Sequence, residues 1–258
     1  MGGGNLLSFL SQLAYNSGIL SKFANFFCSS LSRSLLRLIF FSQKLSDENY
    51  SDHPSWDWVS ENYNQVYCCM GNHEFYKSFD VATLRNGYCM RIRPNVHSFY
   101  NGIVHLQDTD IILSTLGGYI PLEEAYYTES VVTDFRRILY KGELMTFATF
   151  NEEHRRCLSF IKQAVADSDA KHKIVVTHHV PSFKLQQEKF KDSKANGAFT
   201  VELSDYIEDS DIEYWIYGHS HYNKNLMIGR TKCVSNQLGY VFAKEHEAFN
   251  SEAVLYVD

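Results

Sequence analysis

The 258-residue sequence lacks several features that mark particular classes of protein. It contains no run of about 18 consecutive apolar residues, so a membrane-spanning helix is not expected. A net charge of −6 provides no basic field for unspecific binding to a nucleic-acid backbone. Only 4 prolines, beside 15% aromatic residues, argue against disorder. We therefore expect an ordered globular protein with no membrane partner and no specific nucleic-acid-binding signal.

Cysteines are too sparse for a disulfide scaffold, and no C-x-x-C pair is present. The six cysteines are Cys28, Cys68, Cys69, Cys89, Cys157 and Cys233. Two of them, Cys68 and Cys69, adjoin within an apolar run, which predicts buried thiols. We expect reduced, packed cysteines, as is usual in a cytoplasmic protein.

Acidic residues are absent from the first 46 positions, and the first one is Asp47. A basic, Ser-rich and acid-poor segment is typical of a transit peptide. Met1-Gly2 does not continue into a myristoylation pattern, because position 6 is Leu. An aberrant reading frame or start is the other interpretation of this segment. We predict an atypical segment over residues 1–46 and a domain over residues 47–258.

From about Trp56 onward the sequence alternates between predicted strands and helices. Short apolar runs predict strands at residues 65–70, 173–177 and 214–217, and the last two are typical of strands buried on both faces. Asn151 is the expected N-cap of a helix that ends near residue 166. Further strands are expected at residues 95–100, 103–106, 110–116, 226–234 (a hairpin turning at Gly229) and 253–257. This alternation predicts an α/β fold with parallel pairing and two packed sheets.

Three of the predicted strands end in polar residues that can bind a metal ion. The three segments are Gly71-Asn72-His73-Glu74, His178-His179 and Gly218-His219-Ser220-His221. In an open α/β sheet, ligands bind beyond the carboxyl ends of the strands. Imidazole nitrogens and a carboxamide oxygen suit Zn, Mn or Fe.

Each segment taken alone has a purely structural explanation. A Gly-Asn pair is usually a turn, and His178-His179 can be one packed and one solvated histidine. The i, i+2 spacing of His219 and His221 is expected to be strand-like, with both rings on one side. The coincidence of all three segments after apolar strands favours a shared site.

In content and order, these motifs resemble those of the calcineurin-like metallophosphoesterases. Residues 234–240 also resemble a segment that follows the Gly-His-x-His motif in that family, and the resemblance covers residues 56–258. It implies a two-layer β-sandwich flanked by helices, with two divalent metal ions (Mn, Fe or Zn) at the strand ends. It also implies hydrolysis of a phosphomonoester or phosphodiester by a metal-bound hydroxide.

The resemblance assigns roles to individual residues. Carried over by motif, the metal ligands would be Asn72, His178 and His219 for one ion and His221 for the other. His73 would be the catalytic residue, as a proton donor or electrostatic stabiliser at the leaving-group oxygen. Glu74, which would orient His73, and His179 would lie behind these residues.

Two of the five family motifs, Asp-x-His and Gly-Asp, are not found in residues 1–70. In the family they supply most ligands of the first metal and the carboxylate that bridges both. The remaining set is neutral and lacks an anion to hold two dications about 3.5–4 Å apart, so it supports at most one metal. We therefore expect a fold incomplete at its amino-terminal end and an activity that is weak or lost.

Two functions stay open on this basis. One is hydrolysis of a small phosphorylated substrate, with the missing acids lost through an aberrant amino-terminal part. The other is a non-catalytic pseudoenzyme or binding module that uses the same cleft. The sequence names neither the substrate nor the oligomeric state.

Overall fold

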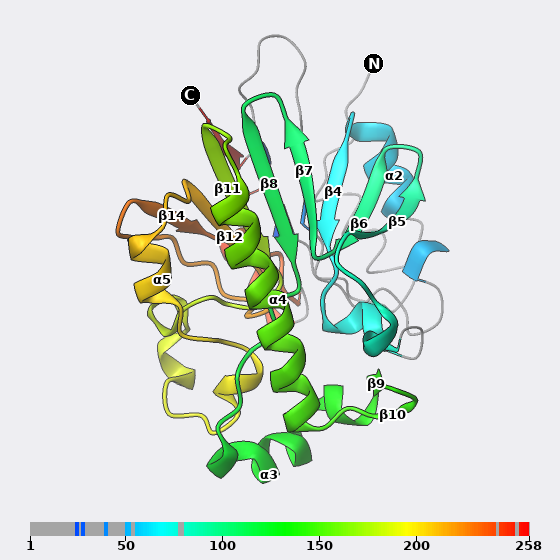
Figure 1. Cartoon of the computed structure of the whole chain (residues 1–258), viewed down its shortest axis with the longest axis vertical. Helices are drawn as coiled ribbons and strands as arrows, with labels where there is room; N and C mark the ends of the chain where they lie inside the picture. The colour runs from blue at the N-terminus through cyan, green and yellow to red at the C-terminus, as the bar shows by residue number, and fades with distance from the viewer. Residues whose placement is uncertain are drawn as a thin grey trace.

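The fold is described from a computed structural model of the chain. It describes residues 24–25, 27–28, 39–40, 50–52, 55–76, 80–240, 243–250 and 253–257. The expectations for residues 1–46, including the incomplete amino-terminal end, lie outside the described residues apart from three two-residue strands. The described chain is a mixed α/β fold with several sheets flanked by helices (Figure 1). This confirms the predicted fold class.

The larger sheet has six strands in the order β13-β14-β12-β11-β8-β7. These strands are β7 (Gly102–Leu106), β8 (Thr109–Ser114), β11 (His172–Thr177), β12 (Tyr214–Tyr217), β13 (Leu226–Ile228) and β14 (Thr231–Val234). The four inner strands run parallel, whereas the edge strands β7 and β13 are antiparallel to their neighbours. The hairpin of β13 and β14 turns at Gly229, where φ is +56°, as the sequence predicts.

The smaller sheet has three strands in the order β4-β6-β5. They are β4 (Val66–Cys69), β5 (Tyr88–Arg93) and β6 (Val96–Tyr100). Helix α2 (Ser55–Asn62) covers one face of this sheet, where Trp56 and Val59 join the buried cluster that contains Val66 and Val96. The apolar face of the helix thus closes that side of the smaller sheet.

Side chains of the larger sheet alternate between two cores, as the pleat requires. Ile112, Val175 and Trp215 pack with residues of α4 (Phe147–Asp167) and α5 (Ser204–Asp209), and α4 crosses this face in Figure 1. The opposite face carries Ile111 and Leu113, which cluster with residues of the smaller sheet such as Phe99. The two sheets therefore enclose one core and the helices close the outer faces.

The remaining elements are short, apart from helix α3 (Leu122–Val131). The other strands are β1 (Ala24–Asn25), β2 (Phe27–Cys28), β3 (Ile39–Phe40), β9 (Leu139–Tyr140), β10 (Glu143–Leu144) and β15 (Val254–Leu255). The 3-10 helices are η1 (Tyr50–Asp52), η2 (Asn72–Phe75), η3 (Val81–Thr83), η4 (Thr133–Arg136), η5 (Phe183–Leu185), η6 (Glu188–Phe190), η7 (Asn196–Ala198) and η9 (Glu245–Ala248). Strand β15 pairs with β2, and β1 pairs with β3.

Two local predictions are wrong. Helix α4 begins four residues before Asn151, with the Thr146 hydroxyl accepting a hydrogen bond from the Thr149 amide. The Asn151 carboxamide instead bonds both backbone groups of Ile120. Cys89 is exposed, since its position on β5 faces outward, whereas Cys68, Cys69, Cys157 and Cys233 are buried free thiols as expected. No helix within the described residues combines the length and apolar character needed to cross a membrane.

Candidate metal centre

The carboxyl ends of four strands meet at one place in the structure. The hydroxyl of Thr115, just after β8, donates to the carbonyl of Met70, just after β4, at 2.7 Å. The amide of His178 after β11 donates to the Ser114 carbonyl at 3.3 Å, and the amide of Gly218 after β12 donates to the His178 carbonyl at 3.2 Å. The first hydrogen bond joins the two sheets, and the other two continue the pairing of β8, β11 and β12, so the three predicted segments lie close together.

Gly71 allows the closest of these approaches. A Cβ atom at Gly71 would lie 2.6 Å from both Cε1 and Nδ1 of His178. Its backbone is extended, so glycine is required here for space rather than for conformation. The imidazole of His178 therefore packs directly over the turn that carries Asn72.

Asn72, His178 and His219 are brought together by this arrangement. Nε2 of His178 lies 2.9 Å from Oδ1 of Asn72 and donates to it, because an amide oxygen only accepts. The centroids of the His178 and His219 rings are 4.5 Å apart. All three residues are buried. The side chains come from segments far apart in the sequence, as predicted.

His179 lies next to this group with a defined tautomer. Its Nδ1 is 3.0 Å from the Thr115 carbonyl, which can only accept, so the proton is on Nδ1. Nε2 then carries a lone pair, and within the described residues this buried atom has no hydrogen-bond partner. Burial lowers the pKa of His179 to about 4, so the ring is neutral at pH 7. Both His178 and His179 are packed, which excludes the alternative of one solvated ring.

His219 and His221 do not follow the expected strand-like geometry. Both have left-handed backbones, with φ of +69° and +53°, which is uncommon for residues with a side chain. The chain therefore turns sharply after β12. The His219 ring packs on His178, whereas Nδ1 of His221 lies 2.8 Å from the Glu245 carboxylate and its ring packs on Tyr240. The expectation of a strand-like backbone at these two residues is therefore wrong.

His73 and Glu74 lie in η2, directly after Asn72. The His73 ring is partly exposed and packs against Tyr76, with ring centroids 4.6 Å apart. The Glu74 carboxyl accepts a hydrogen bond from the Gly71 amide at 2.5 Å, and burial raises its pKa to about 8. The carboxyl braces the turn, and its role in orienting His73 stays a prediction.

The fit to a metal ion depends on these donors. Among the described residues, no three His, Cys, Asp or Glu side chains are arranged to hold a metal ion. The remaining donors are the amide oxygen of Asn72 and the imidazoles of His178 and His219. A cation bound between Asn72 and His178 would replace the proton of their hydrogen bond. This set fits one divalent ion. It offers no carboxylate to bridge a second ion. Nδ1 of His221 contacts Glu245, and the role of His221 as a ligand stays a prediction.

Sequence reasoning missed several side chains that contact the candidate ligands. Asp134 accepts a hydrogen bond from Nδ2 of Asn72 at 2.8 Å, and the Phe199 ring stacks on His219 with centroids 4.9 Å apart. Asp134 lies within residues 121–148, which have no clear hydrophobic period, so no sequence signal marked it. This stretch contains α3, η4 and the β9–β10 pair.

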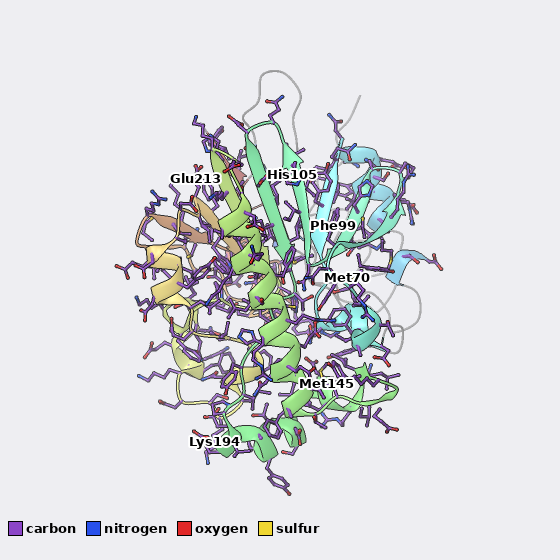
Figure 2. All side chains as sticks on the ribbon, viewed as in Figure 1. Met70, Phe99, His105, Met145, Lys194 and Glu213 are labelled. Carbon is purple, nitrogen blue, oxygen red and sulfur yellow. The ribbon has the colours of Figure 1, made fainter. Side chains whose placement is uncertain are left out.

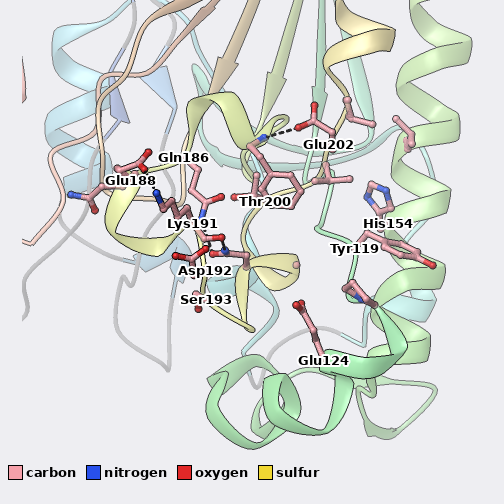
Figure 3. Close-up of a pocket in the computed structure, with 18 residues that line it drawn as sticks. Tyr119, Glu124, His154, Gln186, Glu188, Lys191, Asp192, Ser193, Thr200 and Glu202 are labelled. Carbon is pink, nitrogen blue, oxygen red and sulfur yellow. Dashed lines mark hydrogen bonds and ion pairs between the residues drawn. The ribbon is translucent and has the colours of Figure 1, made fainter.

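A cavity of about 660 Å³ lies between α4 and the loop that contains η5, η6 and η7 (Figure 3). Tyr119 and His154 lie on the side of α4, and Lys191 and Asp192 on the other side. Thr200 lines the cavity, and its neighbour Phe199 stacks on His219. The lining contains more carboxylates than amines, so its charge is negative. The volume is typical of small-molecule sites.

Gly118 and Gly197 join the two sides of this cavity. A Cβ on Gly118 would collide with the backbone carbonyl of Gly197, and a Cβ on Gly197 would collide with that of Tyr119. The loop that contains η7 and the segment before α3 are therefore in backbone-to-backbone contact. Only glycine permits this approach.

Comparison with known proteins gives three findings. The family model of calcineurin-like phosphoesterases matches residues 40–223. An uncharacterized protein of Acanthamoeba polyphaga mimivirus is 27% identical over 219 residues, which cover 78% of this chain and 75% of that protein. The crystal structure of the phosphopantetheinyl hydrolase of Mycobacterium tuberculosis aligns with a TM-score of 0.47 at 13% identity, covering 70% of this chain and 71% of that one.

Proposed function

Because the chain belongs to the calcineurin-like phosphoesterase family, we propose that it hydrolyses a small phosphate ester at the ends of β4, β11 and β12. The observation that carries this proposal is the 2.9 Å contact between Asn72 Oδ1 and His178 Nε2, with the His219 ring beside it. A divalent ion such as Mn, Fe or Zn bound there would neutralise phosphate oxygens and lower the pKa of a bound water to about 7.

Different residues would bind the ion, donate the proton and bind the organic part of the substrate. Asn72, His178 and His219 would hold the ion, and the partly exposed His73 would give a proton to the leaving oxygen. The cavity lined by Tyr119 and His154 would take the organic part of the ester. Its excess of carboxylates favours a neutral or cationic group over a polyanion.

A second candidate is a pseudoenzyme or binding module that uses the same cleft without turnover. It is favoured by the absence, among the described residues, of three His, Cys, Asp or Glu side chains arranged around one metal position. Without a bridging carboxylate, two-metal chemistry has no support in this part of the chain. We therefore propose a turnover that is weak compared with that of a two-metal enzyme.

The experiment combines metal titration with a generic substrate. The full chain is titrated with Mn²⁺ by calorimetry and assayed with bis(4-nitrophenyl) phosphate, for the wild type, His219→Ala, His221→Ala and His105→Ala. His105 is the matched control, because its ring bonds Asp110 at the start of β8, away from the carboxyl ends of the strands (Figure 2).

Mn²⁺-dependent turnover that His219→Ala abolishes and His105→Ala retains would support the enzyme. Mn²⁺ binding without turnover, lost in His219→Ala, would support the module. A wild-type chain that neither binds Mn²⁺ nor hydrolyses the substrate would contradict the proposal.

A further inference from the structure

We propose that Asp134 is a positioning residue that sets the orientation of the Asn72 carboxamide and thereby the metal affinity of the centre, an inference that rests on the proposed function. Asp134 lies in η4, 62 positions after Asn72 in the sequence. Its Oδ1 accepts hydrogen bonds from Asn72 Nδ2 at 2.8 Å and from the Tyr76 hydroxyl at 2.5 Å.

The two ends of a carboxamide are alike in shape and opposite in chemistry. The carboxylate oxygen of Asp134 accepts, so it holds the NH₂ end of Asn72 toward itself. The carbonyl end, Oδ1, must then point the other way, and it lies 2.9 Å from His178 Nε2. A flipped amide would set oxygen against oxygen at Asp134 and would offer an NH₂ group, which cannot ligate a cation.

The Asp134 carboxylate is held in place by its own surroundings. Asp134 is buried, with only 2% of its surface exposed. The neighbouring Phe135 ring packs on Phe150 with centroids 5.8 Å apart, and Ile138 forms a β-bridge with Tyr76. Because η4 is fixed on both sides, the carboxylate cannot follow a rotating amide.

Asp134 also brings negative charge to a centre whose candidate ligands are neutral. A hydrogen bond from Asn72 Nδ2 to a carboxylate polarises the amide and makes its oxygen a better donor to a cation. Partners of this kind change metal affinity by about 10–100-fold when they are replaced. We expect replacement of Asp134 to change the metal affinity of the centre within this range.

The test uses two measurements on the full chain. The first is exchange of the Asn72 side-chain amide protons in the metal-free protein by NMR, with the signal identified from Asn72→Ala. The second is calorimetric titration with Mn²⁺. In Asp134→Asn, we expect the amide protons to exchange faster and the Kd for Mn²⁺ to rise by about 10–100-fold. Tyr76→Phe, which removes the hydroxyl donor to Asp134 and leaves the Asn72 donor in place, should have a smaller effect.

Asp80→Asn is the matched control. Its carboxylate also accepts hydrogen bonds across this region, but from the backbone amides of Ala82, Lys141 and Gly142. We expect this variant to leave both the Asn72 exchange and the Kd for Mn²⁺ unchanged.

The outcomes separate this inference from the proposed function. If Asn72→Ala weakens Mn²⁺ binding and Asp134→Asn does not, the role of Asp134 is overturned and the site stands. If Asn72→Ala binds Mn²⁺ like the wild type, or the wild type does not bind it, the proposed ligand set fails and this role with it. Rapid exchange of the Asn72 amide in the wild-type chain would overturn the inference even if Asp134→Asn does not fold.

Discussion

Replacement of Gly71 by alanine should damage both the packing and the metal affinity of the candidate centre. The added methyl carbon would lie 2.6 Å from Cε1 and Nδ1 of His178, and that residue is only 1% exposed, so its ring cannot swing into solvent. The extended backbone of Gly71 suits alanine, so the cost is steric. Overpacking of this kind costs about 1–3 kcal/mol. In a chain of this size, each kcal/mol lowers the Tm by about 2–4 °C.

The free energy of unfolding is measured by urea denaturation, and the Kd for Mn²⁺ by calorimetry. We expect Gly71→Ala to lose stability and to bind Mn²⁺ more weakly, because a displaced His178 ring loses its 2.9 Å contact with Asn72. Gly142→Ala is the control, since φ is +82° there and nothing lies within 4 Å of the added carbon. It should cost about 1–2 kcal/mol of backbone strain and leave Mn²⁺ binding unchanged. A loss below about 0.5 kcal/mol with unchanged Mn²⁺ affinity in Gly71→Ala would refute the reasoning.

Three further measurements test the structure. Mn²⁺ at about 100 times its Kd should raise the free energy of unfolding by about 2.7 kcal/mol, and His219→Ala should remove this gain in a thermal-shift assay. Ile161→Ala, at a fully buried position of α4, should cost about 2–5 kcal/mol in urea denaturation, whereas Leu122→Ala, at a position 76% exposed, should cost almost nothing. Burial lowers the pKa of His154 below that of an unfolded histidine, so the unfolded chain binds more protons, and stability should fall as the pH drops below about 6.5. His154→Asn should flatten this decline between pH 7.5 and 5 without removing the hydrogen bond to the Leu116 carbonyl, and an unchanged slope would contradict the assignment.

Hydrophobic patterning was sufficient for the central strands and insufficient for the segments around the site. The runs that form β4, β11 and β12 are short, mostly apolar and buried. Burial requires apolar side chains, so the pattern of these runs identifies them as strands. Helix α4 begins earlier than predicted because Thr146 provides the cap, while Asn151 is used in a tertiary contact with Ile120. The same residue type can cap a helix or hydrogen-bond a distant loop, and only the fold distinguishes the two roles.

The candidate centre was likewise predictable only in part. Asn72, His178 and His219 were predictable as candidates because each follows a buried strand. The end of one parallel sheet explains why His178 and His219 meet, whereas Asn72 reaches them from the smaller sheet. The direction of His221 was not predictable, since it depends on the left-handed backbone of two non-glycine residues. Asp134 was not predictable either, because its partner is 62 positions away and its own segment has no regular period.

The contact of Gly118 with Gly197 has a consequence for how this protein can diversify. Since main chain touches main chain there, the separation of the two sides of the neighbouring cavity at this point is set by the backbone and not by side chains. Substitutions of Tyr119, Lys191 or Asp192 can thus alter the polarity and charge of the cavity without moving this backbone contact. A descendant could acquire a new ligand preference through a few point substitutions, provided that both glycines are inherited intact.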